Sequence, residues 1–311
     1  MPSEFALIDR YFKHPTRHTV LGVGDDAALI RPSQGCELAV STDMLVAGTH
    51  FLADTDAEDL GWKVLAVNLS DLAAMGALPR WALLAAALPA ATESWLERFA
   101  RGLFACADAF DVDVIGGDTT KGPRNFCVTI IGEVPAGEAL RRSGAEAGDD
   151  IWVSGQPGRA ALGLAHLQGR HVLGEPRLGD CLAALHRPQP RVALGLALRG
   201  LAHAAIDVSD GLLADLGHIL EASHLAASLR FEALPPAGIE RDSLLAGGDD
   251  YELVFTAPSS QRERILDLAA TLALPLARIG STEPGHAGGM RVVDGLGQAI
   301  VVSQRGFDHF A

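Results

Sequence analysis

Aspartates beside glycine, serine or threonine recur along this 311-residue chain and are the residues best suited to chemistry. Six such segments occur: GVGDD (22–26), STD (41–43), NLSD (68–71), GGDTT (116–120), DVSDG (207–211) and GGDD (247–250). Four of them directly follow apolar runs that are typical of strands or buried helices, so their aspartates are expected at the rim of a sheet. Two carboxylates about 4 Å apart repel each other by roughly 4 kcal/mol at an effective dielectric constant near 20. If these aspartates converge they require cations, and oxygen-rich sites of this kind suit Mg²⁺ completed by substrate phosphates.

The NLSD segment gives the strongest single indication of a functional site. Asn68 and Asp71 are three residues apart, hence on one face of a helix otherwise built from valine, leucine and alanine. Because an unpaired carboxylate is costly to bury, Asp71 is expected to face a cation or a cleft.

The other segments are ambiguous when each is taken alone. GVGDDA formally matches the dinucleotide-binding pattern G-x-G-x-x-A, but that pattern must open a helix, and Pro32 leaves room for barely one turn. Asp25 and Asp26 could be plain turn residues. The STD segment could cap a helix, GGDTT could be a glycine turn at a strand end, and Ser209 or Asp210 could be an N-cap. No P-loop pattern G-x-x-x-x-G-K-[ST] occurs in the sequence.

Composition narrows the class of protein. The net charge of −14 argues against a nucleic-acid partner or an anionic membrane surface, because both require clustered lysine and arginine. The 4 cysteines are isolated in the sequence, which favours reduced thiols in a cytoplasmic protein. The first residues do not form a signal peptide, and the longest apolar stretch, Trp81 to Ala91, is too short to span a membrane.

The pattern of elements predicts two α/β domains. We expect helices at 5–12, 56–75, 92–110, 159–167, 192–204, 211–223 and 259–272, and strands within 22–30, 36–46, 81–89, 112–118, 126–134, 151–155, 204–210 and 252–256. Thr55 and Glu58 have the spacing of a capping box. The polar, glycine-rich stretch 135–150 is the expected domain boundary.

Taken in order, these segments make the chain resemble the thiamine-monophosphate kinase family. That family belongs with aminoimidazole ribonucleotide synthetase, selenophosphate synthetase and a hydrogenase maturation factor. The resemblance is carried nearly end to end by EFALIDRYF, GVGDDAALI, STDMLVAGTHF, KVLAVNLSDLAAMGA, IGGDTTKG, RSGAEAGDDIWVSG, HRPQPR, AIDVSDGLLADLGHI, GGDDYELVFT and GFDHF. It implies a mixed α/β fold with two domains of the aminoimidazole ribonucleotide synthetase type. Residues 1–137 would be a metal- and ATP-binding dimerisation domain and 138–311 a C-terminal α/β domain, with ATP bound between them in a homodimer.

The resemblance also implies a role for individual residues. Magnesium ligands would be Asp26, Ser41, Thr42, Asp43, Asp71, Asp118, Asp207 and Asp210. ATP contacts would be Gly117, Asp118, Arg142 and Ser209, and contacts to thiamine monophosphate would be His50, Asp249 and Phe307. Where this chain has Asp249 the family often has glutamate, whose reach is one methylene longer.

The activity implied is transfer of the γ-phosphoryl group of ATP to thiamine monophosphate, giving thiamine diphosphate. The acceptor phosphate is already ionised, so direct in-line transfer without a covalent nucleophile is expected. Two alternatives stay open: a sister ATP-dependent synthetase acting on a purine intermediate, selenide or a carbamoyl group, and a non-catalytic protein that binds divalent cations.

Overall fold

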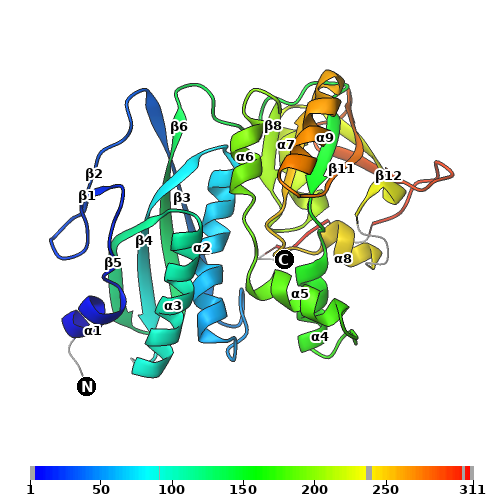
Figure 1. Cartoon of the computed structure of the whole chain (residues 1–311). Helices are drawn as coiled ribbons and strands as arrows, with labels where there is room; N and C mark the ends of the chain where they lie inside the picture. The colour runs from blue at the N-terminus through cyan, green and yellow to red at the C-terminus, as the bar shows by residue number, and fades with distance from the viewer. Residues whose placement is uncertain (1–3, 91, 236–239, 303–304, 309–311) are drawn as a thin grey trace. The chain divides into compact units, whose positions relative to one another are not determined.

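The computed structural model describes residues 4–90, 92–235, 240–302 and 305–308, and its backbone contacts divide the chain into two compact units (Figure 1). One unit comprises Met1–Leu72 and Ala77–Gly137, and the other Ala73–Gly76 and Glu138–Ala311. Each contains a sheet and helices, which confirms the expected mixed α/β class. Within the described ranges, no helix combines the length and the apolar composition needed to cross a membrane.

The N-terminal unit is built on a four-stranded sheet in the order β3-β6-β4-β5, in which β4 and β5 are parallel and the other pairs are antiparallel. Its elements are α1 (Glu4–Tyr11), β1 (Thr19–Leu21), β2 (Leu29–Ile30), β3 (Cys36–Val46), α2 (Ala57–Ala74), β4 (Leu78–Leu88), α3 (Glu93–Ala109), β5 (Asp113–Lys121) and β6 (Asn125–Pro135). Helices α2 and α3 lie over one face of this sheet (Figure 1). Side chains alternate along each strand, so Phe126, Val128 and Ile130 of β6 are buried while the intervening residues are partly exposed.

Helix α2 is apolar on nearly all sides, and its residues Leu60, Val64, Leu65 and Leu69 are fully buried. It begins differently from the capping box expected at Thr55 and Glu58. Asp56 Oδ1 accepts hydrogen bonds from the backbone N–H groups of Glu58 (2.9 Å) and Asp59 (3.4 Å). An aspartate side chain satisfies the first amides of the helix more directly than the predicted pair would.

Helices α2 and α3 touch backbone to backbone at two glycines. A Cβ atom added at Gly61 would lie 2.0 Å from the carbonyl oxygen of Phe99, and one at Gly102 would lie 1.8 Å from that of Glu58. This close approach lets α3 reach the sheet, where Phe99 stacks on Phe126 with ring centroids 4.7 Å apart.

The C-terminal unit contains a six-stranded sheet in the order β12-β9-β11-β7-β10-β8. Its strands are β7 (Asp150–Ser154), β8 (Ala204–Asp207), β9 (Ala226–Arg230), β10 (Leu253–Ala257), β11 (Leu276–Glu283) and β12 (Gly289–Val293). Its helices are α4 (Arg159–Leu167), α5 (Arg177–His186), α6 (Val192–Leu198), α7 (Leu212–Ala222), α8 (Arg241–Ala246) and α9 (Arg262–Thr271), with the 3₁₀ turns η1 (Phe231–Ala233) and η2 (Ser259–Gln261). Leucines and isoleucines of α7 pack with β7, β8 and β10 into one core.

Three sequence expectations about elements are wrong in detail. The strand expected within 22–30 is reduced to β2, and GVGDD lies in the loop between β1 and β2 because its two glycines and two aspartates favour a turn. GGDTT does not follow a strand but continues β5. The helix expected over 192–204 ends at Leu198, and Ala204 already begins β8.

The space around two helical glycines, Gly102 at the contact of α3 with α2 and Gly217 in α7, predicts opposite effects when each is changed to alanine. Gly102→Ala should lower the free energy of unfolding by roughly 1–3 kcal/mol, because its methyl group would collide with backbone that cannot move without separating the helices. Gly217→Ala in α7 meets nothing within 4 Å and should raise that free energy by up to about 1 kcal/mol through helix propensity. Urea unfolding followed by circular dichroism measures both. Equal stability of the two variants would contradict this packing.

Candidate functional site

Three oxygen-bearing side chains that the sequence singles out gather where β3 passes α2. Ser41 Oγ donates a hydrogen bond to Asp71 Oδ2 at 2.5 Å, and the backbone N–H of Asp43 donates to Asn68 Oδ1 at 3.0 Å. Asn68 is fully buried and its amide nitrogen donates to Val64 O at 3.0 Å, which fixes which way its oxygen points. Ser41 and Asp43 lie two residues apart on β3, so both side chains are on the face that α2 covers. The structure thus brings Ser41, Asp43 and Asp71 together.

Thr42 and Asp118 are not part of this group within the N-terminal unit. The hydroxyl of Thr42 lies on the open face of the sheet, 2.8 Å from the hydroxyl of Thr129. Asp118 lies on β5, which is separated from β3 by β6 and β4. Three strand spacings place it about 14 Å from β3.

Gly117 has a conformation and a packing position that suit glycine alone. Its φ is +145°, and an added Cβ would lie 1.8 Å from the carbonyl oxygen of Leu84. A side chain is therefore excluded, and the backbone at Gly117 and Asp118 stays accessible along the exposed part of β5. Backbone amides exposed in this way can approach a phosphate closely.

Asp26 and His50 lie in loops of the N-terminal unit. Asp26 is exposed between β1 and β2, and its backbone N–H donates to Asp25 Oδ1 at 2.9 Å. His50 follows β3, and its Nδ1 accepts a hydrogen bond from the backbone N–H of Val46 at 3.0 Å. That bond holds the imidazole ring against the end of the strand.

In the C-terminal unit, Asp215 organises the loop that follows β8. Its Oδ2 accepts hydrogen bonds from the backbone N–H groups of Ser209, Asp210 and Gly211 at 3.0–3.1 Å. Burial raises the pKa of Asp215 to about 6, and the nearby Asp210 carboxylate also raises it, while the three amides lower it. The alternative that Ser209 or Asp210 merely caps α7 is wrong, because Gly211 occupies the N-cap position and Asp215 binds these amides from inside the helix.

The GGDD segment is tied to that same loop. The backbone N–H of Asp249 donates to Ser209 O at 2.7 Å, and that of Tyr251 donates to Val208 O at 2.9 Å. Asp249 and Tyr251 have φ values of +70° and +54°, which are strained for residues other than glycine. Such strain often occurs at functional sites.

Two buried carboxylates on either side of Tyr251 stabilise this strained backbone. Asp250 accepts hydrogen bonds from the backbone N–H groups of Gly158 (2.5 Å) and Ala160 (3.1 Å) at the start of α4, and burial raises the pKa of Asp250 well above its ordinary value. Glu252 accepts two bonds of 2.6 Å from the guanidinium of Arg191. Sequence reasoning did not assign these residues a role. The sequence feature that could have drawn attention to Arg191 was its position at the end of HRPQPR, one of the segments that carry the family resemblance.

Phe307 joins the loop after β8, whereas Arg142 is a surface residue. The backbone N–H of Phe307 donates to Asp210 O at 2.9 Å, and the residue is 52% exposed. Asp207 is a buried residue at the end of β8. Arg142 is exposed, and its carbonyl oxygen accepts a bond from Ser223 Oγ at 3.1 Å. The C-terminal unit therefore brings together Asp207, Ser209, Asp210, Asp249 and Phe307 from three segments that backbone hydrogen bonds join.

The donor set of the first unit fits a hard cation. In the ranges that the structure describes, no three Asp, Glu, His or Cys side chains approach one another closely enough to hold a metal ion by themselves. Mg²⁺ commonly binds through one or two carboxylates and completes its shell with water and substrate phosphates. Asp43, Asp71 and the hydroxyl of Ser41 supply ligands of that kind.

Comparison with known proteins places the chain in a family. Residues 24–134 match the model "AIR synthase related protein, N-terminal domain", and residues 146–293 match the corresponding C-terminal domain. The chain is 46% identical to the thiamine-monophosphate kinase of Salmonella typhimurium over 99% of this chain and 98% of that protein.

Two solved structures are also similar. The thiamine-monophosphate kinase of Stenotrophomonas maltophilia is 48% identical, with a TM-score of 0.86 over 96% of this chain and 98% of that one. A structure described as AaThiL complexed with AMPPCP and TMP is 30% identical, with a TM-score of 0.78 over 99% of this chain and 97% of that one. The chain belongs to the AIR synthase related proteins and, within them, to the thiamine-monophosphate kinase family.

Proposed function

We propose that this protein transfers the γ-phosphoryl group of ATP to thiamine monophosphate and so produces thiamine diphosphate. The observation that carries the proposal is the juxtaposition of Ser41, Asp43 and Asp71 beside a buried asparagine that fixes the strand. Similarity over nearly the whole chain to thiamine-monophosphate kinases supports it. So does a related structure whose complex contains AMPPCP and TMP.

Several magnesium ions are part of this proposal. Asp43, Asp71 and Ser41 would hold magnesium as one group in the N-terminal unit. Asp26, Asp118 and an oxygen of Thr42, which lie outside that group, would contribute to further ions. Asp207 and Asp210 would hold magnesium in the C-terminal unit. When bound, Mg²⁺ offsets the charge of the phosphate groups. The carboxylates are suited to this because they carry charge next to buried structure that holds them still.

The remaining predicted residues bind and orient the two substrates. The backbone at Gly117 and Asp118 can approach the phosphates of ATP, and Ser209 and Arg142 can donate further hydrogen bonds to them. His50, Asp249 and Phe307 would contact thiamine monophosphate, the exposed ring of Phe307 stacking on its heterocycle. Phosphoryl transfer depends mainly on alignment and charge neutralisation, so these residues need no covalent nucleophile beside them.

A homodimer formed through the open face of the N-terminal sheet is also part of the proposal. On that face β3 exposes Leu38, Val40 and Met44, of which Val40 is 61% exposed. A strand of alternating exposed apolar residues beside a helix-covered face is typical of a surface that another sheet covers. A second copy of the chain would cover it.

We infer that the enzyme works in the cytoplasm. Its phosphoryl donor, ATP, is a cytoplasmic metabolite, and its 4 cysteines are free.

Incubation of the protein with ATP, Mg²⁺ and thiamine monophosphate tests the activity directly. We expect thiamine diphosphate, detected by fluorescence after oxidation, in amounts equal to the ADP released. ADP release that requires a purine intermediate, selenide or carbamoyl substrate instead would support a sister synthetase. Calorimetry showing cation binding that is indifferent to nucleotide, without turnover, would support a cation-binding protein.

Replacing either carboxylate of the N-terminal group should nearly abolish turnover. Asp43→Asn and Asp71→Asn keep the side-chain shape but remove a charge, and each should lower kcat by at least about 100-fold while the circular dichroism spectrum is unchanged. Asp267→Asn, at an exposed position of α9, is the control and should leave kcat unaltered. Near-normal turnover of both variants at saturating magnesium would rule out the proposed role of this group.

A charge on the open face of the sheet should dissociate the dimer. Val40→Glu places an unpaired carboxylate in the proposed interface, so the mass measured by sedimentation should fall from that of two chains to that of one. Leu266→Glu, at a residue of α9 that is 53% exposed, should leave the mass unchanged. Finding the unaltered protein as a monomer would refute the proposed interface.

A further inference from the structure

The hairpin that carries Asp26 is poorly anchored by its own apolar side chains. This segment, residues 19–30, comprises β1, β2 and the loop between them, and we call it the aspartate hairpin. Val20, Leu21 and Leu29 on its strands are 56%, 38% and 55% exposed. Burial of apolar surface therefore contributes little to holding it in place, and its position has to depend on polar contacts at its two ends.

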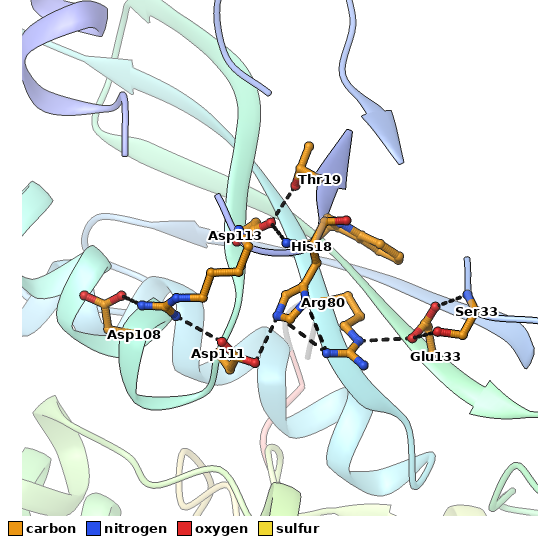
Figure 2. Close-up of polar contacts among 10 residues, drawn as sticks. His18, Thr19, Ser33, Arg80, Asp108, Asp111, Asp113 and Glu133 are labelled. Atoms are coloured by element: carbon orange, nitrogen blue, oxygen red, sulfur yellow. Dashed lines mark hydrogen bonds and ion pairs between the residues drawn. The ribbon is translucent and has the colours of Figure 1, made fainter. Parts of the chain in front are cut away.

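At the first end, one buried carboxylate accepts hydrogen bonds from three successive residues. Asp113, at the start of β5, accepts hydrogen bonds from the backbone N–H groups of Arg17 (2.8 Å) and His18 (2.7 Å) and from Thr19 Oγ1 (2.6 Å). Figure 2 shows the hydroxyl of Thr19 and the backbone N–H of His18 directed toward Asp113, while the His18 ring points to Asp111 and Arg80. Asp113 is only 3% exposed, so water cannot readily replace these donors.

At the second end, a carboxylate on β6 accepts hydrogen bonds from the residue that lies just after the hairpin. Glu133 accepts hydrogen bonds from the backbone N–H of Ser33 (2.5 Å) and from Ser33 Oγ (3.0 Å), and Arg80 Nε donates to it at 3.0 Å (Figure 2). Burial alone would raise the pKa of Glu133, but the bonds from Ser33 and Arg80 outweigh that effect and lower the pKa, so the carboxylate is ionised.

The two ends are linked to each other. Arg80 Nη1 lies 3.4 Å from His18 Nδ1. Arg80 therefore contacts both Glu133 and His18, whose backbone N–H is bound by Asp113. The outer ion pairs of Arg17 with Asp108 and Asp111 involve side chains that are about half exposed, and such pairs contribute little. The buried carboxylates are therefore the effective anchors.

We propose that Asp113 and Glu133 are positioning residues for magnesium binding, because they hold both ends of the aspartate hairpin and so fix where Asp26 stands. This inference rests on the proposed function, in which Asp26 is a magnesium ligand. Asp113 and Glu133 act through the backbone at Arg17–Thr19 and Ser33 and do not themselves touch an ion or a substrate.

The test compares Asp113→Asn and Glu133→Gln with the milder Thr19→Val and with Asp150→Asn as a matched control. Asp150 is a buried carboxylate of the C-terminal unit that accepts bonds from Arg262 and Arg278, so its loss lowers stability without touching the hairpin. Thr19→Val removes one bond to Asp113 and keeps the shape of the side chain, so it remains informative if a carboxylate variant does not fold.

Two readouts separate positioning from general stability. Hydrogen exchange without metal or substrate should show faster exchange of amides within residues 19–30 in the hairpin variants and not in Asp150→Asn. The magnesium concentration that gives half-maximal rate should rise about 10- to 100-fold in Asp113→Asn and Glu133→Gln, as is usual when residues behind a metal ligand are lost. Thr19→Val should raise this magnesium concentration by a smaller factor. The KM for thiamine monophosphate at saturating magnesium should stay unchanged in all these variants.

Each outcome bears on the proposal. Faster exchange in the hairpin together with a higher magnesium concentration at half-maximal rate supports it. Unchanged exchange, or a magnesium requirement equal to that of the Asp150→Asn control, overturns it even if the unaltered enzyme is fully active. Absence of kinase activity in the unaltered protein would instead refute the proposed function.

Discussion

The arrangement of the N-terminal unit depends on compensating the charge of one carboxylate on a helix that is otherwise packed in apolar side chains. Asp71 lies one turn after the fully buried Asn68, and both face β3. An isolated charge there would be costly to desolvate. Ser41 offsets part of this cost by donating a hydrogen bond to Asp71, and Asn68 offsets the burial of the Asp43 amide. A cation next to Asp43 and Asp71 would offset the remainder, so the same electrostatics that make the arrangement costly make it a good site for a metal.

In the C-terminal unit, too, buried carboxylates hold the segments that carry the proposed ligands. Its loop after β8 is held by Asp215 from inside α7, and its GGDD segment by the buried Asp250 and the ion pair of Glu252 with Arg191. Both supports bind backbone or arginine, and neither Asp250 nor Glu252 is among the proposed ligands. Buried carboxylates thus serve as scaffolding in both units, while the proposed aspartate ligands other than the buried Asp207 are exposed or half-buried.

That distinction explains how much the sequence could predict. The two-sheet α/β class and the long apolar α2 followed from periodicity, because helix and strand spacing fixes which side chains share a face. The grouping of Asp71 with the STD segment was implied only by the family resemblance. Local conformations were less predictable. Nothing in GVGDDAALI shows that only Leu29–Ile30 pairs as a strand, and the supporting roles of Asp113, Glu133 and Glu252 depend on contacts between residues far apart in the chain. Propensity does not encode such contacts.

The supporting carboxylates also bear on why the proposed ligands can be spread over so many segments. The proposed ligands of the N-terminal unit lie on four different segments. Asp26 is in a hairpin loop and Asp71 on a helix, while Asp43 and Asp118 are on the two opposite edge strands of the sheet. Mutual repulsion between such groups favours their separation in the absence of cations. Hydrogen bonds hold the hairpin through Asp113 and Glu133 and the β3 strand through Asn68. Strand β5 is held by its pairing with β4, where the backbone of Gly117 packs closely against Leu84. Positions fixed in advance reduce the rearrangement that binding of metal and nucleotide would otherwise require.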